Sequence, residues 1–287
     1  KENKEDILVL GNIRFYLEEE KNEEKFSKKL ASLGDIYVND AFSCSHREHA
    51  SICNITKYIP SYSGLQINSE IEALKKITTK IKKPITCIIG GSKISSKINI
   101  IRNLIPRFNN IIFVGGMANN ILRNKGIKIG KSIYEESSEE IINQIFFEAS
   151  KYNCKLFYPI DVKVGKSLND TSKIKEAKKI DDEDIILDLG PKTINKIIEL
   201  IKNSSTILWN GPAGYFENPN FAEGSEKIAR CIADRRNDLY SVAGGGDTVA
   251  VLNSLNLIER FNFVSTAGGA FLEYLEGKIL PGIKALK

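Results

Sequence analysis

Short apolar runs alternate with amphipathic stretches along most of the chain. The apolar runs are rich in Ile, Val and Leu and predict strands at Ile7–Leu10, Ile36–Val38, Ile85–Ile89, Ile111–Val114, Ile207–Trp209, Leu239–Ala243 and Phe261–Ser265. The stretches between them have helical periodicity and predict helices at Glu20–Leu33, Ser69–Ile81, Ser95–Ile105, Ser138–Lys151, Thr193–Lys202, Phe221–Arg235 and Thr248–Leu255. Strands that alternate with helices form βαβ units, and nearly continuous apolar strands are buried on both faces. The pattern therefore predicts an α/β fold built on a parallel sheet.

Two segments depart from this alternation. Residues 61–81 are expected to mark a domain boundary, because Pro60, Ser61 and Gly64 interrupt the chain and a long amphipathic helix follows. Pro159–Asp184 is polar and has no helical period, so we expect a surface loop or a small hairpin there.

Composition and charge exclude several classes of protein. Hydrophobic residues make up 42% and charged residues 27% of the chain, which is typical of a globular protein. No apolar run approaches the ~20 residues that a membrane helix needs, and the charged Lys1–Asp6 is unlike a secretory signal. The net charge of +5 is spread along the chain without a basic, aromatic-rich stripe, so nucleic acid is not an expected partner. The five cysteines form no Cys-x-x-Cys pair, which favours reduced thiols in a cytoplasm over zinc or redox sites.

Glycines recur where the predicted strands end. They stand at Gly90-Gly91, Gly115-Gly116, Gly211 and Gly214, Gly244–Gly246, and Gly268-Gly269. A single such position is explained by a tight turn between a strand and a helix. Five of them on one rim instead favour a site for phosphate, which binds beyond the carboxyl ends of parallel strands at helix N-termini. The chain has neither a P-loop nor a Gly-x-Gly-x-x-Gly after its first strand, which disfavours a dehydrogenase-type Rossmann protein.

Four charged side chains in these loops have alternative explanations. Lys93 and Lys97 are four residues apart and would share one face near a helix start, either against an anion or as two solvated lysines. Asp247 follows three glycines and is either a helix N-cap or a ligand of Mg²⁺ that bridges nucleotide phosphates. Glu217 could accept hydrogen bonds from a ribose or could be an ordinary surface acid.

Taken together, these motifs resemble those of the phosphoglycerate kinase family. They occur in the family's order and span nearly the whole chain: Leu10–Phe15, Gly34–Phe42, Ser45–His49, Gly90–Lys97, Gly115–Met117, Trp209–Glu217, Gly244–Thr248, Ser265–Ala270 and Leu275–Gly282.

The resemblance implies a fold and a reaction. We expect a parallel-sheet, Rossmann-like nucleotide domain at 83–270 and an incomplete second α/β domain at 1–63, which binds 3-phosphoglycerate. A hinge helix at 64–82 would join the two, and the C-terminal segment 271–287 would return to the first domain. The implied reaction moves a phosphoryl group between 1,3-bisphosphoglycerate and ADP, with Mg²⁺ and ATP/ADP as requirements. A cytoplasmic monomer that acts on small molecules is implied as well.

The resemblance also implies site residues. Arg14, His46 and Arg47 match positions that bind the triose phosphate, although surface hydrogen bonding also accounts for His46 and His49. Lys97, Lys93, Gly245 and Gly246 match catalytic positions, and Lys97 is the better candidate for contacting the migrating phosphoryl group. The implied nucleotide-binding residues are Gly91, Ser92, Lys97, Gly115, Gly116, Asn210, Gly211, Pro212, Glu217, Gly245, Gly246, Asp247 and Thr248, with Asp247 also holding Mg²⁺.

The chain departs from the family pattern in several places. Ala267 replaces a glycine and is harmless if its φ stays negative, Ser92 stands where Ala is frequent, and Ser43 and Cys44 alter the approach to His46. Family members carry roughly a hundred more residues, a small domain's worth, before the position of Lys1. We expect either a piece of a normal enzyme, favoured by the missing initiator Met, or a non-catalytic nucleotide-binding remnant. The 287-residue chain alone is expected to bind ADP weakly and to show no kinase activity.

Overall fold

The computed structural model describes residues 9–286, which divide into two units. The first unit contains the described residues up to Glu70 and those from Ile279 onward, and the second contains Ile71–Lys278. The division falls inside helix α3 (Leu65–Thr78), which begins four residues before the predicted helix.

The first unit consists of short elements. They are the 3-10 helices η1 (Ile13–Phe15), η2 (Phe42–Cys44) and η3 (Asn54–Lys57), the α-helices α1 (Leu17–Glu20), α2 (Glu24–Ala31) and α11 (Pro281–Lys284), and the parallel strands β1 (Tyr37–Asn39) and β2 (Ser61–Ser63). The amide of Gly282 donates to the Ser45 carbonyl at 2.8 Å, so the C-terminal helix is tied to the loop after η2.

Two sequence predictions in this unit need correction. The helix predicted at Glu20–Leu33 is shorter, Glu24–Ala31, because Asn22 adopts a left-handed backbone with φ of 53° that separates it from α1, which ends at Glu20. Half of the predicted strand Ile7–Leu10 lies outside the described residues, and Val9 and Leu10 form no regular structure. Strand β2 had no clear sequence signal, because it is a three-residue polar strand.

A six-stranded parallel sheet forms the centre of the second unit. Its spatial order is β11-β10-β9-β3-β4-β5, with β3 at Ile85–Ile89, β4 at Asn110–Phe113, β5 at Lys155–Phe157, β9 at Thr206–Asn210, β10 at Tyr240–Gly244 and β11 at Phe263–Ser265. Five of these strands match the predicted ones to within two residues. The order reverses between β3 and β9, which is the Rossmann arrangement, so the predicted fold class is confirmed.

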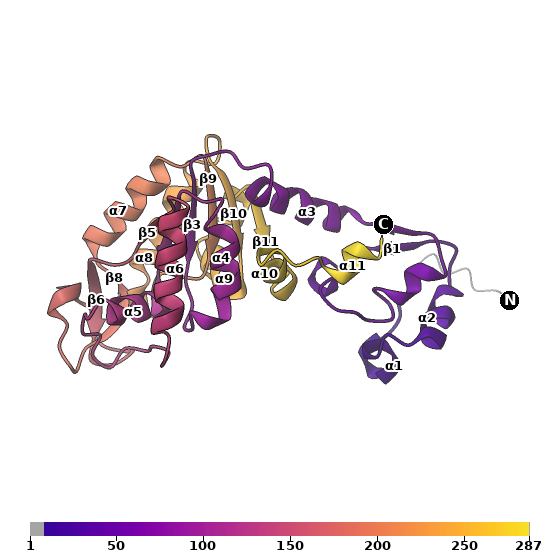
Figure 1. The fold of residues 1–287 in the computed structure, drawn as a ribbon, viewed down its shortest axis with the longest axis horizontal. Coiled ribbons are helices and arrows are strands. Elements are labelled where there is room, and N and C mark those ends of the chain that lie inside the picture. The colour runs from indigo at the N-terminus through magenta and orange to yellow at the C-terminus, as the bar shows by residue number, and fades with distance from the viewer. Residues whose placement is uncertain (1–8, 287) are drawn as a thin grey trace. The chain divides into compact units, whose positions relative to one another are not determined.

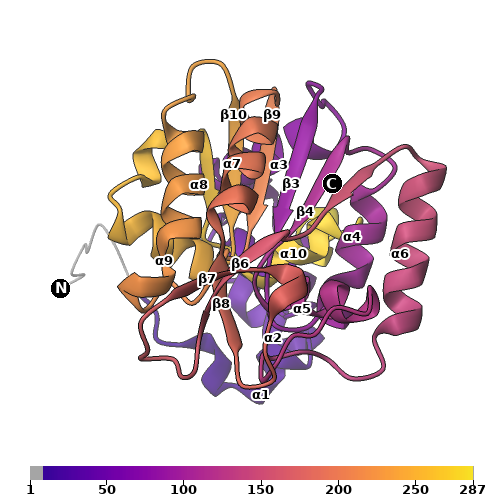
Figure 2. The same ribbon diagram turned by 90° about the vertical axis from the view of Figure 1, so that its left-hand side faces the viewer.

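Helices cover both faces of this sheet (Figure 1). Helices α7 (Pro191–Lys202), α8 (Glu223–Ala233) and α9 (Gly246–Ser254) share one apolar core with it, and Ile197, Ile228 and Leu252 pack with Trp209 there. Figure 2 shows α4 (Ile98–Leu104) and α6 (Glu139–Lys151) on the other side of the sheet. Helices α5 (Gly115–Asn124) and α10 (Gly269–Leu275) complete the unit, with the short 3-10 helices η4 (Ser95–Lys97), η5 (Ala177–Lys179), η6 (Pro219–Phe221) and η7 (Ile258–Arg260).

The polar segment Pro159–Asp184 forms most of a small second sheet. Strands β6 (Asp161–Gly165) and β7 (Lys173–Glu176) make an antiparallel hairpin, and β8 (Ile185–Leu189) pairs antiparallel with β6. The hairpin alternative is therefore confirmed, although the third strand, β8, was not predicted. None of the helices that the structure describes is long and apolar enough to cross a membrane.

Candidate active site

The carboxyl ends of β3 and β9 meet where the strand order of the sheet reverses. Gly90 follows β3, and Gly211 follows β9 with a φ of +108°. A Cβ atom on Gly211 would lie 2.6 Å from the carbonyl carbon of Gly90, so the two loops touch through their backbones. In open α/β sheets this reversal point is where ligands bind.

One pocket of about 250 Å³ opens at this edge of the sheet. It is lined by Gly91, Ser92, Gly115, Gly116, Ala118, Asn119, Ile133, Pro159, Leu168, Ile185–Leu189, Pro212–Glu217 and Asp247. Of the five glycine positions at strand ends, three line it through Gly91, Gly115-Gly116 and Gly214, a fourth (Gly244–Gly246) adjoins it through Asp247, and Gly268-Gly269 is not among the lining residues. The prediction of a shared site at the carboxyl edge of the sheet is therefore confirmed for four of the five positions.

Lys97 lies behind the glycine wall of this pocket. Its Nζ donates to the Gly90 carbonyl at 2.6 Å and to Asn210 Oδ1 at 2.5 Å, and a Cβ atom on Gly91 would be 3.6 Å from it. Burial lowers the pKa of Lys97 to about 8, although the nearby Asp247 carboxylate favours the charged form. The structure thus holds a partly buried amine directly behind a backbone that lines the pocket.

Lys93 does not share a helix face with Lys97, and that prediction is wrong. Helix α4 begins only at Ile98, η4 ends at Lys97, and Lys93 lies in the loop before η4. The Glu135 carboxylate accepts hydrogen bonds from both the backbone amide and the hydroxyl of Ser95, the first residue of η4, which stabilises a helical start at Ser95, after Lys93. Lys93 itself is exposed.

Asn210 and Thr248 join the loops after β9 and β10. The Asn210 side-chain amide donates to the Gly244 carbonyl at 2.7 Å, and the Gly211 amide donates to Thr248 Oγ1 at 2.7 Å. Both side chains are buried, and their hydrogen bonds hold the backbone of Gly244 and of Gly211 in place. Gly245 comes next with a φ of +94° and is the N-cap of α9.

Asp247 is not a helix N-cap, so that alternative is wrong. The N-cap of α9 is Gly245, and Asp247 is an exposed residue of the first helical turn that lines the pocket. Within residues 9–286 there is no group of three or more metal-ligating side chains. A single carboxylate still fits Mg²⁺ that arrives with phosphates, because that ion is commonly held by one or two carboxylates together with substrate oxygens.

Two further predicted residues, Ser92 and Glu217, line the pocket and are exposed. Ala267 has no positive φ, which satisfies the condition under which its replacement of glycine is harmless, and the following Gly268 takes the left-handed conformation with φ of +53°.

Sequence reasoning missed one whole wall of the pocket. This wall contains Ile133, Leu168 and strand β8, Ile185–Leu189. Gly190 directly follows β8, but it was not among the glycine positions singled out from the sequence, and β8 belongs to the small antiparallel sheet. The apolar run Ile185–Leu187, followed by Gly190, was the signal that could have revealed the strand.

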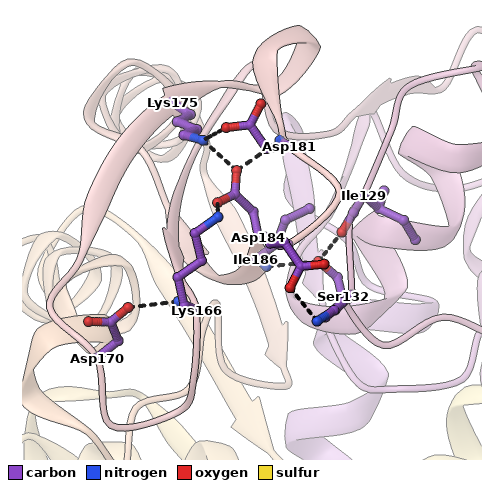
Figure 3. Close-up of polar contacts among 10 residues, drawn as sticks. Ile129, Ser132, Lys166, Asp170, Lys175, Asp181, Asp184 and Ile186 are labelled. Carbon is purple, nitrogen blue, oxygen red and sulfur yellow. Dashed lines mark hydrogen bonds and ion pairs between the residues drawn. The ribbon is translucent and has the colours of Figure 1, made fainter.

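A polar network holds this second wall together (Figure 3). The Asp184 carboxylate binds Lys166 Nζ at 3.0 Å and Lys175 Nζ at 2.5 Å and accepts from the Asp181 amide at 2.8 Å. The Ile186 amide donates to Ser132 Oγ at 2.8 Å. This hydrogen bond connects β8 to the segment that carries Ile133, another apolar residue of this wall. Although burial opposes ionisation, the hydrogen bonds from Lys175, the Asp181 amide and Lys166 lower the pKa of Asp184 to about 2.

We expect Asp184→Asn to lower the free energy of unfolding at pH 7 by about 2 kcal/mol. A carboxyl with a lowered pKa contributes stability above its unfolded pKa of about 3.9 and loses that stability as the pH falls through its folded pKa. The variant should therefore lose less stability than the parent chain between pH 4 and pH 2, as measured by urea unfolding. Asp182→Asn removes an exposed ion pair to Lys128 and should change little. Equal losses in both variants would contradict the role of the network.

The three candidate triose-phosphate residues lie in the first unit. Arg14 is exposed in η1, and its Nη2 donates to Cys44 Sγ at 3.5 Å, which places it beside the loop that carries His46 and Arg47. Arg47 is exposed and His46 is half-buried.

Buried Glu19 fixes the end of that loop. Its carboxylate accepts from the Ser51 amide at 2.9 Å and from the Ser51 hydroxyl at 2.6 Å. His49 is also buried, with Nδ1 3.6 Å from Glu19 Oε1, so the surface explanation is wrong for His49.

Comparison with known proteins agrees with this geometry. A family model described as phosphoglycerate kinase matches residues 1–278. Phosphoglycerate kinases from Wolbachia pipientis wMel and Dictyoglomus turgidum are each 44% identical to this chain, over 286 and 284 residues, and each alignment covers 98% of this chain and 72% of the relative. The solved structure of phosphoglycerate kinase from Coxiella burnetii superposes with a TM-score of 0.91 at 39% identity, covering 96% of this chain and 71% of that one. The chain therefore belongs to the phosphoglycerate kinase family.

Proposed function

We propose that this protein transfers a phosphoryl group between 1,3-bisphosphoglycerate and ADP, which yields 3-phosphoglycerate and ATP. The family membership supports the reaction. The observation that carries the proposal is the pocket at the reversal point of the sheet, with the amine of Lys97 directly behind its backbone wall. Phosphoryl transfer needs little covalent participation from the protein, so positioned cations and amides are sufficient machinery.

ADP or ATP would occupy this pocket. The apolar side chains of Ile133, Leu168 and Leu187 suit a base, and the exposed carboxylate of Glu217 suits the hydroxyls of a ribose. Helices α5 and α9 begin at the pocket with Gly115 and Gly246, and the free amides and positive dipole ends of such helices favour phosphates.

Lys97 and Lys93 would stabilise the migrating group. Its negative charge is spread over several oxygens in the transition state, and fixed cations lower the barrier most where they require no rearrangement. Lys97 is already held in place by Gly90 and Asn210, whereas Lys93 is exposed, so we assign the larger contribution to Lys97. Gly245 and Gly246 would leave the backbone amides of α9 accessible.

In the first unit we assign the triose phosphate to Arg14, Arg47 and His46. Guanidinium groups bind phosphate and carboxylate oxygens through two parallel hydrogen bonds. Two arginines and a histidine on adjoining loops therefore suit a substrate that carries both groups.

Mg²⁺ would be held by Asp247 together with nucleotide phosphates. When bound, the ion supplies neutralising positive charge between phosphate oxygens. The exposed Asp247 carboxylate lies in the first turn of α9 and lines the pocket. Because Asp247 is not the N-cap of α9, its carboxylate can bind an ion without breaking a capping hydrogen bond.

We expect Asp247→Ala to weaken Mg-ADP binding by about 10-fold and metal-free ADP binding by less than about twofold. The difference arises because only the metal complex uses the carboxylate. Calorimetric titrations with and without Mg²⁺ measure it, and Asp234→Ala, which removes an acid at the C-terminal cap of α8, serves as control. Equal losses for the two ligand forms would rule out the metal role.

A non-catalytic nucleotide-binding protein is the second candidate. The pocket alone fits both candidates, but relatives at 44% identity that are named phosphoglycerate kinase favour the enzyme. A coupled assay of ATP formation from 1,3-bisphosphoglycerate and ADP, on the protein produced from its complete gene, tests the proposal. ATP formation is expected, whereas ADP binding without it would favour the second candidate. We further propose a cytoplasmic monomer with small-molecule substrates and no nucleic-acid partner.

A further inference from the structure

We propose that Asp188 is a positioning residue of the nucleotide pocket, which holds the loop Pro212–Glu217 against strand β8 and thereby sets the affinity for the nucleoside part of ADP. This inference rests on the proposed function, because it assumes that the pocket binds ADP. Asp188 is 2% exposed and lies on β8, in the wall that sequence reasoning missed.

The carboxylate of Asp188 lies between two backbone segments. A Cβ atom on Gly214 would come within 2.5 Å of Asp188 Oδ1, and one on Gly224 within 2.3 Å. Gly214 belongs to the pocket loop and Gly224 to the first turn of α8. Glycine at both positions therefore allows one buried carboxylate to contact the loop and the helix at the same time.

Hydrogen bonds around Asp188 connect the same three elements. The Gly224 amide donates to Asp188 Oδ2 at 2.9 Å, and the Tyr215 amide donates to the carbonyl of the preceding residue, Leu187, at 2.7 Å. The Ala213 amide donates to Ser225 Oγ at 2.9 Å. The pocket loop is thus held by β8 on one side and by the start of α8 on the other, and Asp188 is the side chain that contacts both.

Asp161 on β6 offers a direct comparison within the same small sheet. It is also 2% exposed and also caps a helix, since its carboxylate accepts from the Lys192 amide at 2.9 Å and the Thr193 amide at 2.7 Å. Both of its oxygens have partners, and it does not line the pocket. Asp188 Oδ1, in contrast, has no hydrogen-bond partner among residues 9–286.

The close approach of Asp188 Oδ1 to Gly214 of the pocket loop, together with its lack of a hydrogen-bond partner among residues 9–286, indicates that Asp188 does more than cap α8. Leaving such a group without a hydrogen bond costs about 1–3 kcal/mol, so a buried oxygen of this kind calls for an explanation. Burial raises the pKa of Asp188 to about 7, and the nearby Glu223 carboxylate raises it as well. The amides of Gly224 and Leu189 and the Lys163 amine lower that pKa in part. The carboxyl can therefore be neutral below pH 7, where its unpartnered oxygen carries no full charge.

The test compares ADP with tripolyphosphate, which has the phosphates and lacks the nucleoside. We expect Asp188→Ala to raise the Kd for ADP by about 10-fold and to change the Kd for tripolyphosphate by less than about twofold. A change of about 10-fold corresponds to the loss of one capping contact together with the contact to the loop. Asp161→Ala is the matched control, because it removes a buried cap of the same kind away from the pocket. It should lower the unfolding temperature and leave the ratio of the two Kd values unchanged.

Asp188→Asn keeps the shape of the side chain and serves if Asp188→Ala does not fold. In the parent chain, the Kd for ADP divided by the Kd for tripolyphosphate should rise between pH 6 and pH 8. The reason is that the Asp188 carboxyl then becomes charged while it is buried beside the loop Pro212–Glu217. In Asp188→Asn this pH dependence should disappear. Because Lys97 acts on the phosphates of both ligands, its titration cancels in the ratio.

Three results would overturn the assignment: equal losses of both ligands in Asp188→Ala, the same loss of ADP in Asp161→Ala, or an unchanged pH profile in Asp188→Asn. A parent chain that binds tripolyphosphate and not ADP would instead overturn the proposed nucleotide site. The two failures are therefore distinguishable.

Discussion

Replacing Lys97 by alanine should lower the turnover of phosphoryl transfer by about 10²–10³-fold, the usual cost of losing one fixed electrostatic contact. The Lys97 amine is held by the Gly90 carbonyl and Asn210 Oδ1 next to Gly91 of the pocket wall, so its positive charge is fixed close to the pocket. Coupled ATP-formation rates of the protein produced from its complete gene measure the effect.

Substitutions of two other lysines serve as comparisons for the loss of turnover in Lys97→Ala. Lys93→Ala removes an exposed amine of the same loop and should cost clearly less than Lys97→Ala. Lys128→Ala removes an exposed amine that pairs with Asp182 and should leave turnover unchanged. A loss at Lys93 as large as the loss at Lys97 would contradict our ranking of the two lysines.

Binding of ADP should also change the protonation of Lys97. Its pKa is about 8 without ligand, because burial disfavours the ammonium form. Phosphate oxygens nearby would raise that pKa, so ADP binding near pH 8 should take up protons from the buffer. Calorimetry in buffers of different ionisation enthalpy detects the uptake, and its persistence in Lys97→Ala would assign it to another group.

The sequence predicted the main sheet better than the rest of the fold. Strands such as Ile85–Ile89 are buried on both faces and consist almost entirely of apolar residues, so no competing pattern obscures them. The small antiparallel sheet was only partly predicted, because strand β7 (Lys173–Glu176) is largely exposed and alternates charged residues with few apolar ones. Its hairpin β6–β7 was expected as an alternative to a loop, whereas the pairing of β8 with β6 leaves no periodic pattern in the sequence.

The candidate site divides in the same way. At Gly90 and Gly211 two backbone segments lie so close that a side chain would not fit, and only glycine is tolerated. The sequence therefore indicates these positions directly through the residue type. Asp188 and Ile133 reach the pocket only through the tertiary fold, so an isolated sequence could not single them out. The local geometry of Lys93 was predicted wrongly because the helical segment starts only at Ser95, whose amide donates to the carboxylate of the distant Glu135.

Replacing Gly211 by alanine should have the largest effect on stability, with a loss of about 3–5 kcal/mol in the free energy of unfolding. Two costs add up at this position. The φ of +108° strains any residue that has a Cβ atom, and that atom would lie 2.6–2.7 Å from the backbone of Gly90, which cannot move without shifting β3. Because these two loops form the edge of the pocket, ADP binding should be lost together with stability.

Gly126→Ala separates the two costs at Gly211. Gly126 has a φ of +74°, and a Cβ atom there would have no atom within 4 Å, so the position carries the backbone strain without the clash and should lose only about 1 kcal/mol. Chemical unfolding of both variants at the same pH gives the difference. If Gly211→Ala lost no more stability than Gly126→Ala, the loops after β3 and β9 would have room to separate. The pocket would then not depend on their close contact, and the reversal point of the sheet would lose its role in shaping the site.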